Sequence, residues 1–294
     1  MLPLPARAGA GALTRRLIVC ADDFGLDAAV NQAVEQASRD GILTCASLMV
    51  SAPDAADAVA RARRLPKLRI GLHLTLVDGA PTLPPGQIPD LVDESGRFRA
   101  NMATAGFRFF FLPRVRRQLA AEIRAQFEAF HATGLALDHA NAHKHMHIHP
   151  TVARLMVEIG RDYGLKAVRV PAEPAGVLRA AGENVAPLVY APWVALMRRR
   201  FRRAGLAVND CLLGLRWTGA MTEDRVLRLM AVLPEGVSEL YGHPAVAQSP
   251  ALARLMPHYR PADELAALVS PAVRQAVARA GANLASYADI TPLS

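Results

Sequence analysis

The chain has 294 residues, of which 52% are hydrophobic and 20% are charged. This composition is typical of a globular protein and excludes a mostly disordered chain. Its 20 glycines and 21 prolines follow no period, which excludes a collagen-like repeat, and no uncharged apolar run is as long as the ~20 residues of a membrane-spanning helix. The net charge of +8 fits an anionic partner without identifying it.

The first residues and the three cysteines of the chain bear on its location. Residues 1–13 contain no charged start followed by a long apolar stretch, so we expect a flexible leader rather than a signal peptide. Residues 14–294 are expected to form one domain. Cys20, Cys45 and Cys211 lie far apart without a C-x-x-C pair, which argues against a disulfide framework and favours a reducing, cytoplasmic location.

The first half of the chain alternates short apolar runs with helical patterns. Asp27 is a suitable N-cap and Gly41 a suitable end for the first helix. Residues 78–100, rich in Pro, Gly and Asp, predict a long loop, and loops of this length are usually functional. Strands are predicted at 16–20, 42–50, 68–76 and 135–142. Further helices are predicted at 54–65 and 114–133.

The same alternation continues in the second half, where residues 172–207 break the rhythm as an insertion. Strands are predicted at 166–170, 210–217 and 237–242, and helices at 151–163, 222–233 and 262–280. Continuous apolar strands that alternate with helices indicate a parallel sheet covered on both faces. About seven repeats favour an α/β fold of the TIM-like (β/α)-barrel type, in which the chemistry lies at the carboxyl ends of the strands.

Two adjacent carboxylates follow the first predicted strand. Asp22 and Asp23 repel each other, so a buried pair needs a cation or a proton to offset its charge. A solvated turn or a helix cap is the alternative, but Asp27 already fills the cap. Neighbouring side chains of a strand point to opposite faces. Both can therefore serve one site only if the chain curls, which Gly25 would allow.

Histidines collect at the ends of other predicted strands. His73 lies on an apolar strand, where a lone histidine is more often a core residue than a ligand. His143, His145, His147 and His149 would share one face of an extended chain, although a polar loop that binds metal adventitiously is the alternative. A catalytic zinc site takes three protein ligands, so these four histidines cannot all join Asp23 and His73 in one site. His143, the nearest to its strand end, is the favoured ligand.

One aspartate and two histidines from three strands would leave open positions on a single divalent ion, as catalytic sites do. Zinc is the preferred ion, and magnesium, manganese, cobalt and nickel are alternatives. Such an ion lowers the pKa of a bound water to about 7 and polarises a carbonyl oxygen. Asp22 would then be the general base and His243, which follows the strand at 237–242, the general acid. The site suits amide or ester hydrolysis.

The sequence resembles the YdjC-like carbohydrate deacetylases, also called ChbG-like, over most of its length. The matching segments are ADDFGL (21–26), DGILTCASLMV (40–50), GLHLTL (71–76), NAHKHMH (141–147), RVP (169–171) and ELYGHP (239–244). The resemblance implies a deacetylase-type barrel that removes an N-acetyl group from an amino sugar. By the same resemblance Asp23, His73 and His143 hold the metal, Asp22 is the base and His243 the acid.

Two positions qualify this resemblance. The family often has Asp-Ser-His where this chain has Asn141, Ala142 and His143. This difference leaves open whether a carboxylate supports the metal ligands, but the ligand His143 itself is present. Arg169 is similar to a basic family position that faces the site, which implies a substrate-binding role. A surface arginine is the alternative reading of Arg169.

A lipid substrate is suggested by two segments. Residues 106–130 are similar to the hopanoid-biosynthesis-associated members of the family, which implies an N-acetylglucosaminyl hopanoid as the glycolipid substrate. Residues 106–117 and 187–203 place aromatic and apolar side chains beside arginines, a pattern that suits peripheral contact with an anionic membrane. A buried helix with a solvated basic end, or a contact between subunits of a homo-oligomer, remains an alternative for both segments.

Other functions stay open at this point. Soluble chitooligosaccharides are an alternative substrate. A barrel amidohydrolase acting on a small cyclic amide usually presents H-x-H after its first strand, where this chain has Asp-Asp. A metal-binding or membrane-adaptor protein would depend on His145, His147 and His149 instead. Nucleic-acid binding is not expected, because the few aromatic residues cluster with aliphatic ones rather than with the arginines.

Overall fold

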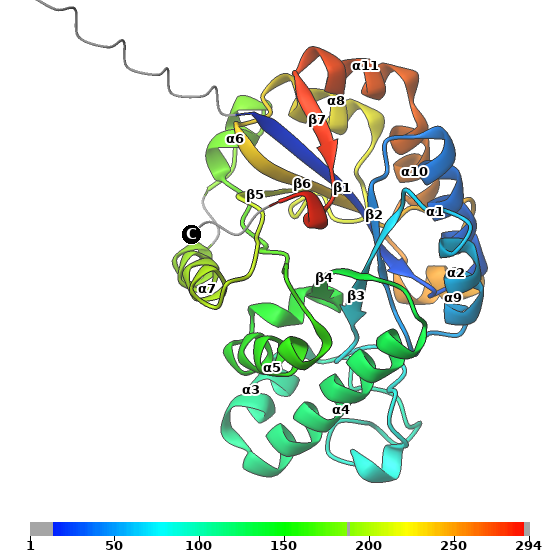
Figure 1. Ribbon diagram of the computed structural model, residues 1–294, viewed down its shortest axis with the longest axis vertical. Coiled ribbons are helices and arrows are strands. Elements are labelled where there is room, and N and C mark those ends of the chain that lie inside the picture. Colours follow the sequence, from blue (N-terminus) through cyan, green and yellow to red (C-terminus); the bar gives the residue numbers. More distant parts are fainter. Residues whose placement is uncertain (1–13, 187–188, 291–294) are drawn as a thin grey trace, which may run out of the picture.

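The computed structural model describes residues 14–186 and 189–290, and the leader expected at 1–13 lies outside this range. A curled parallel sheet of seven strands forms its centre (Figure 1). The strands are β1 (Arg15–Phe24), β2 (Cys45–Leu48), β3 (Arg69–Leu74), β4 (Leu137–Ala142), β5 (Cys211–Leu213), β6 (Gly236–Gly242) and β7 (Ala282–Ala285). The predicted α/β class with a barrel-type parallel sheet is confirmed.

The strand order is β4-β3-β2-β1-β6-β5, and β7 pairs with the first half of β1. Short bridges connect the two ends of this path, since Ala140 pairs with Val168 and Ala167 pairs with Ala207. The strand expected at 166–170 is reduced to these bridges. Its ladder stops because the next backbone N–H, that of Val170, donates to the Asn209 side chain at 2.6 Å.

Eleven α-helices lie along the described chain, mostly on the outer face of the sheet (Figure 1). They are α1 (Ala28–Asp40), α2 (Ala55–Ala62), α3 (Met102–Phe111), α4 (Pro113–Ala132), α5 (Pro150–Gly160), α6 (Ala175–Ala180), α7 (Ala191–Arg203), α8 (Glu223–Ala231), α9 (Pro250–Leu255), α10 (Pro261–Val269) and α11 (Pro271–Arg279). None of the helices described is long and apolar enough to cross a bilayer.

Local sequence explains where several helices begin and end. The Asp27 carboxylate accepts the backbone N–H of Ala29 at 2.8 Å, so α1 is capped as predicted. The single helix expected at 262–280 is two helices, because Pro271 has no N–H to continue the first and Ser270 caps the second. The insertion at 172–207 contains α6 and α7. Helix α3 was not expected as a separate helix, and it ends at Leu112 before Pro113.

The predicted loop at 78–100 is held against α4 by a buried carboxylate. Glu122 accepts the backbone N–H groups of Thr82 and Leu83 at 2.8 and 3.0 Å. Its neighbour Gln126 bonds both the N–H and the carbonyl of Thr75. These bonds satisfy backbone groups where β3 leaves the sheet, and they fix the start of the loop beside the strand ends.

Alternate residues of β1 bury two different cores. Leu17 and Val19 pack with the helices that cover the sheet. Ile18 and Cys20 join a smaller cluster inside the barrel, which Tyr287 of the short helix η4 (Tyr287–Asp289) also enters. This period of two is the pattern of a strand buried on both faces. It aims the following residues, Asp22 and Asp23, at the carboxyl end of the barrel.

Candidate metal centre and active site

The end of β1 curls, as a shared site for both aspartates requires. Asp23 has a φ of +60°, in the left-handed region, and Gly25 has a φ of +96°. The pairing of β1 with β2 shifts register between Ala21 and Phe24, which is the mark of a β-bulge. A non-glycine residue in this region carries backbone strain, and such residues cluster at functional sites.

Three predicted ligands from three elements meet at this curl. His73 on β3 places Nε2 at 3.2 Å from Oδ1 of Asp23. His143, the first residue of the short helix η2 (His143–Ile148), places Nδ1 at 2.9 Å from the same oxygen. One potential ligand atom of each residue lies within 4.8 Å of the others. The structure thus brings Asp23, His73 and His143 together at one point.

The hydrogen bonds around His73 test whether these residues fit a cation. Ionised Asp22 can only accept, so the Asn141 amide nitrogen at 3.2 Å must donate to it. The Asn141 carbonyl oxygen then faces Nδ1 of His73 at 2.6 Å, and this nitrogen must carry the proton. Nε2 of His73 is therefore left with a lone pair directed at a carboxylate oxygen of Asp23. Two facing acceptors need a cation or a proton between them.

A second observation agrees with this fit. The other carboxylate oxygen of Asp23, Oδ2, is buried and has no hydrogen-bond partner among the described residues. A buried oxygen without a partner is costly unless an ion or a water satisfies it. A carboxylate with two imidazoles is also a donor set suited to zinc and to other divalent transition metals. The residues present fit a divalent cation.

Asn141 stands at the position where the resemblance had left a supporting carboxylate open, and it contacts the predicted ligand His73. Its carbonyl orients His73, while its amide nitrogen donates to Asp22 and, at 2.9 Å, to Ser47. Partners of this kind fix the tautomer and the ring orientation of metal-binding histidines. The Asn141 amide thus both accepts from His73 and donates to Asp22, which an ionised carboxylate could not do.

Asp22 forms a buried ion pair beside the three ligands. The Arg169 guanidinium donates to its two oxygens at 2.5 and 2.9 Å, and the same guanidinium bonds Glu239 of β6. Burial alone would raise the pKa of Asp22. The charge of Arg169, with smaller contributions from His73 and His243, outweighs that effect and holds the pKa well below its ordinary value. Asp22 is therefore ionised across the physiological pH range.

Arg169 lies in the interior of the protein, beside Asp22. This side chain is fully buried, so it is not a surface arginine. Four hydrogen bonds to Asp22 and Glu239 occupy its guanidinium, which lies 5.0 Å from the centre of the Tyr241 ring. It does not line the pocket that contains Asp22. Four of its five N–H donors are thus engaged by Asp22 and Glu239. The substrate-binding role of Arg169 stays a prediction.

His243 lies in the same pocket as the metal-site histidines. A cavity of about 70 Å³, here called the site pocket, is lined by Asp22, His73, His143 and His243 among others. The His243 ring lies between the rings of Tyr241 and Tyr259, with centroids 5.6 and 5.0 Å away. Its Nδ1 is buried and has no hydrogen-bond partner among the described residues. The structure thus brings His243 to the same pocket as Asp22, His73 and His143, and its role as the acid stays a prediction.

The remaining histidines of the 143–149 run do different things. His145 lines the site pocket with Nε2 at 3.2 Å from the Tyr241 hydroxyl. His147 is buried and its Nε2 donates to the backbone carbonyl of Arg169 at 3.1 Å. His149 accepts the backbone N–H of Thr151 and caps α5. The run does not form one face, because the chain turns at Lys144 and His145 with φ values of +51° and +52°.

Inside the barrel, a second group of potential ligands lies beneath the site. Cys20 and Cys45 are register partners on β1 and β2, and both lie near His139. Burial alone would raise the pKa of Cys20, but hydrogen bonds to Cys45 and His139 outweigh it and lower that pKa to about 7. His139 also bonds Asp138 at 2.8 Å and stacks on Tyr287. The sequence did not predict this group, because Cys20, Cys45 and His139 lie on three strands that only the fold brings together.

Glu239 was also missed as a site residue. It is completely buried on β6, and it accepts from Arg169 and from the Tyr287 hydroxyl at 2.5 Å. A glutamate in the middle of the apolar run 237–242 is itself a signal, because a buried carboxylate requires a charged or hydrogen-bonding partner.

Comparisons with known proteins agree with this geometry. The family model described as YdjC-like protein matches residues 16–279. A carbohydrate deacetylase of Geobacillus stearothermophilus is 29% identical over 96% of this chain and 100% of its own length. One from Brevibacillus brevis is 36% identical, over 53% of this chain and 59% of its own length.

A solved structure gives the same result for the fold. A protein of Enterococcus faecalis V583, named for cellobiose-phosphate cleavage, is similar with a TM-score of 0.73 and 26% identity. The similarity covers 95% of this chain and 99% of that one. Together with the family model, which spans all the strands that carry site residues, this likeness shows that the chain belongs to the YdjC-like protein family.

Proposed function

We propose that this protein is a metal-dependent carbohydrate N-deacetylase, which hydrolyses the N-acetyl amide of an N-acetylglucosamine-type sugar. The observation that carries the proposal is the meeting of Asp23, His73 and His143 within 4.8 Å, with Asp22 next to them. The names of the curated relatives, which are carbohydrate deacetylases, support the same activity. The alternative of an adaptor that binds metal through His145, His147 and His149 has less support, because these three do not form a group of potential metal ligands among the described residues.

Asp23, His73 and His143 would hold one divalent cation. When bound, such an ion polarises a carbonyl oxygen and lowers the pKa of a water. Zinc is the ion we expect, since an aspartate with two histidines leaves open positions as catalytic zinc sites do. The departure of the site from a closed four-ligand arrangement favours catalysis over a structural role.

The proton transfers fall to two residues that line the site pocket. Asp22 remains ionised because of Arg169, so it can accept the proton of the attacking water. Asn141 and Arg169 together fix the direction of its oxygens. His243 is the proton donor to the departing amine nitrogen, since its Nδ1 has no other partner among the described residues. The base lies on β1 and the acid directly follows β6, the neighbouring strand.

The finer proposal concerns what carries the sugar. We propose a glycosylated hopanoid lipid, with acetate and a free glucosaminyl lipid as the products. The likeness of residues 106–130 to hopanoid-associated members supports this choice. So does the exposure of three phenylalanines in that segment, Phe107, Phe110 and Phe111, which a soluble oligosaccharide would not need.

One experiment tests both levels of the proposal. Mass spectrometry would follow acetate loss from N-acetylglucosaminyl hopanoid and from N-acetylated chitooligosaccharides, each with and without a chelator. We expect chelator-sensitive loss of one acetyl group, and faster turnover of the lipid. Faster turnover of the oligosaccharide would reject the lipid substrate alone. No acetate from either substrate, in protein loaded with zinc, would reject the deacetylase.

A further inference from the structure

Large hydrophobic side chains are exposed in one part of the described surface far more than elsewhere. Nine are exposed among the described residues, and only Leu284 lies outside residues 102–112 and 189–196. Single exposed hydrophobic residues are ordinary, but a cluster of them marks a binding surface. The members of the cluster are Met102, Phe107, Phe110, Phe111, Leu112, Val189, Tyr190 and Leu196.

The two segments come from distant parts of the sequence but rest on the same stretch of chain. On the α3 side, the Phe110 ring lies 6.2 Å from that of His149. On the α7 side, the Trp193 indole N–H donates to the backbone carbonyl of Ile148 at 2.7 Å. Ile148 is the last residue of η2, the helix that begins with His143, and His149 directly follows it. The exposed apolar surface is therefore anchored to the same segment as a candidate metal ligand.

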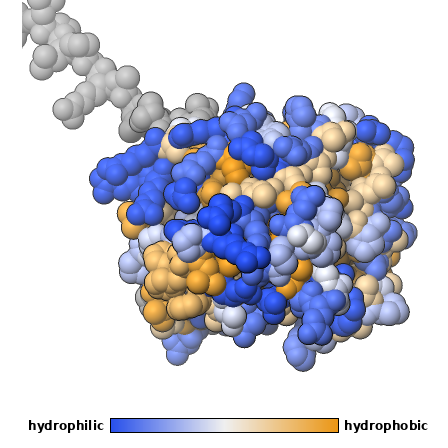
Figure 2. Space-filling view, turned by 90° about the horizontal axis from the view of Figure 1, so that it is seen from below, coloured by the Kyte–Doolittle hydropathy of each residue, from blue (hydrophilic) through white to orange (hydrophobic). Residues whose placement is uncertain are grey.

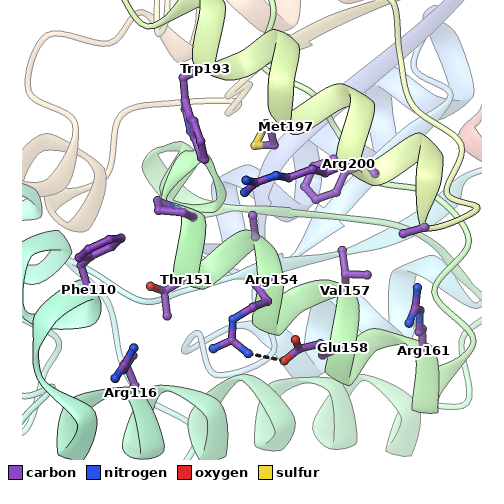
Figure 3. Close-up of a pocket in the computed structure, with 14 residues that line it drawn as sticks. Phe110, Arg116, Thr151, Arg154, Val157, Glu158, Arg161, Trp193, Met197 and Arg200 are labelled. Carbon is purple, nitrogen blue, oxygen red and sulfur yellow. Dashed lines mark hydrogen bonds and ion pairs between the residues drawn. The ribbon is translucent and has the colours of Figure 1, made fainter.

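Between these segments lies a cavity of about 560 Å³, here called the α5–α7 groove. Its apolar wall is formed by Phe110, Val157, Trp193, Met197 and Phe201. Figure 3 shows Trp193 and Met197 reaching from α7 toward α5, with Phe110 at one end. A cavity of this size and lining is typical of sites for small apolar or amphipathic ligands.

Arginines surround this apolar wall. Arg116, Arg154, Arg161 and Arg200 line the groove together with one acidic residue, Glu158. Arg154 pairs with Glu158 at 2.6 Å, the interaction drawn in Figure 3. No carboxylate of the described residues lies within ion-pair distance of the other three arginines. The groove therefore carries a positive charge that this part of the chain leaves unbalanced.

The combination of these features identifies the chemistry of the ligand. Arg200 lies over the Trp193 ring, with 5.4 Å between its guanidinium carbon and the ring centroid. An indole covered by a cation, exposed phenylalanines and unpaired arginines are what an anionic lipid surface contacts at the boundary of headgroups and acyl chains. The view from the α3 end shows a dense hydrophobic patch beside strongly hydrophilic side chains (Figure 2).

We propose that the face formed by α3 and α7 docks on an anionic bilayer, with a lipid phosphate held by the arginines of the α5–α7 groove. Docking would bring the bilayer next to the segment that carries His143. The purpose of this placement rests on the proposed function, because the sugar of a glycolipid substrate has to reach the site pocket from a membrane. The binding step itself requires no turnover and is measured separately.

The test is sedimentation of the full chain with vesicles of phosphatidylcholine alone or with about 30% phosphatidylglycerol. We expect binding to the anionic vesicles only. The variants F107S/F111S and R116Q/R200Q should each bind at least tenfold more weakly, since an arginine near an anionic surface contributes about 1 kcal/mol. L284S/R279Q removes an exposed leucine on β7 and an arginine on α11, and this control should bind like the unmodified chain.

Three results would overturn the inference. The first is unchanged binding in both groove-face variants. The second is free glycerol phosphate that competes for the protein as strongly as the anionic vesicles do, which would indicate a site for a soluble phosphate. The third is a dimer that F107S/F111S converts to a monomer, which would indicate a contact between two copies. All variants should retain hydrolysis of a soluble oligosaccharide, so a protein that binds vesicles but deacetylates nothing would reject the proposed function and leave the docking surface standing.

Discussion

The site pocket and the α5–α7 groove handle charge in opposite ways. The ionised side chains lining the site pocket have partners, since Asp22 pairs with Arg169 and Lys144 with Asp78. In the groove, Arg116, Arg161 and Arg200 have no carboxylate partner among the described residues. Paired and buried groups hold a fixed geometry, as a reaction needs. Unpaired groups around an apolar wall are available to a ligand from outside.

The two regions also differ in what holds them. The site pocket lies on strand ends, and its volume is about 70 Å³ against about 560 Å³ for the groove. Strands fix a side chain more precisely than helices joined by an insertion, because a parallel sheet fixes neighbouring residues by backbone hydrogen bonds. The proposed division places the chemistry at the strand ends and the membrane contact on α3 and α7, and variants in one region at a time test it.

The largest expected effect is the loss of the metal centre. His73→Ala should lose both the bound divalent ion and at least a thousandfold of the deacetylase rate, because one of three ligands and the contact to Asn141 disappear together. Metal analysis of the purified variant, with acetate release from a chitooligosaccharide, measures both. Vesicle binding should be unchanged, which keeps the two regions separate. A variant that still holds one equivalent of metal would reject His73 as a ligand.

A smaller loss of rate is expected from the base. Asp22→Asn should keep the metal but lower turnover by about 10²–10⁴-fold, the usual contribution of a positioned acid–base group. The amide cannot accept the proton, although it preserves the shape of the side chain. The check is a ratio of initial rates at equal metal content. Near-normal turnover would show that another group takes the proton.

Arg169 should matter first for stability. Arg169→Met leaves Asp22 and Glu239 buried without their charge partner, and breaking a buried pair costs about 3–5 kcal/mol. Urea unfolding measures the free energy. Arg169→Lys, which keeps the charge but not the two-pronged contact, should lose less. Equal losses in the two variants would show that geometry, not charge, decides the role of this residue.

The buried imidazole of His147 predicts a dependence of stability on pH. Burial first, and then the charge of Arg169, lowers the pKa of His147 from an ordinary 6.5 to about 3. Because the folded form holds this ring neutral, its contribution is complete above pH 6.5 and is lost as the pH falls from 6.5 toward 3. The slope is about 1.4 kcal/mol per pH unit. Unfolding of His147→Gln should be less steep by that amount, and exposed His131→Gln should match the unmodified chain.

The smallest effect tests whether the exposed face supports the fold. Phe107→Ser should change the free energy of unfolding by less than about 0.5 kcal/mol, because this ring is 62% exposed. Phe109, on the same helix, is buried, and its replacement by alanine should cost about 3–5 kcal/mol. Thermal unfolding compares them. A large cost at Phe107 would show that the face is structural rather than a docking surface.

The sequence predicted the strand-end chemistry better than the groove. Asp23, His73 and His143 follow apolar runs, and parallel strands bring such positions to one edge. The role of Arg169 could not be predicted, because its partner Glu239 lies on a strand 70 residues later and only the fold brings them together. The catalytic roles of all these site residues stay predictions.

The α5–α7 groove could not be predicted from the sequence for a related reason. Both apolar and basic segments were visible, but α3 and α7 lie far apart in the chain, and no local pattern places them around α5. The division of 262–280 into two helices was visible in Pro271. The bridges that replace the strand at 166–170 depend on the Asn209 side chain, which periodicity does not detect.

The most direct test is a titration of metal-free protein with zinc while acetate release from an N-acetylated chitooligosaccharide is followed. We predict no release before zinc is added, and a linear rise that breaks at one equivalent per chain. Release that is undiminished in the metal-free protein, or that stays absent at every zinc level, would contradict a single catalytic cation held by Asp23, His73 and His143.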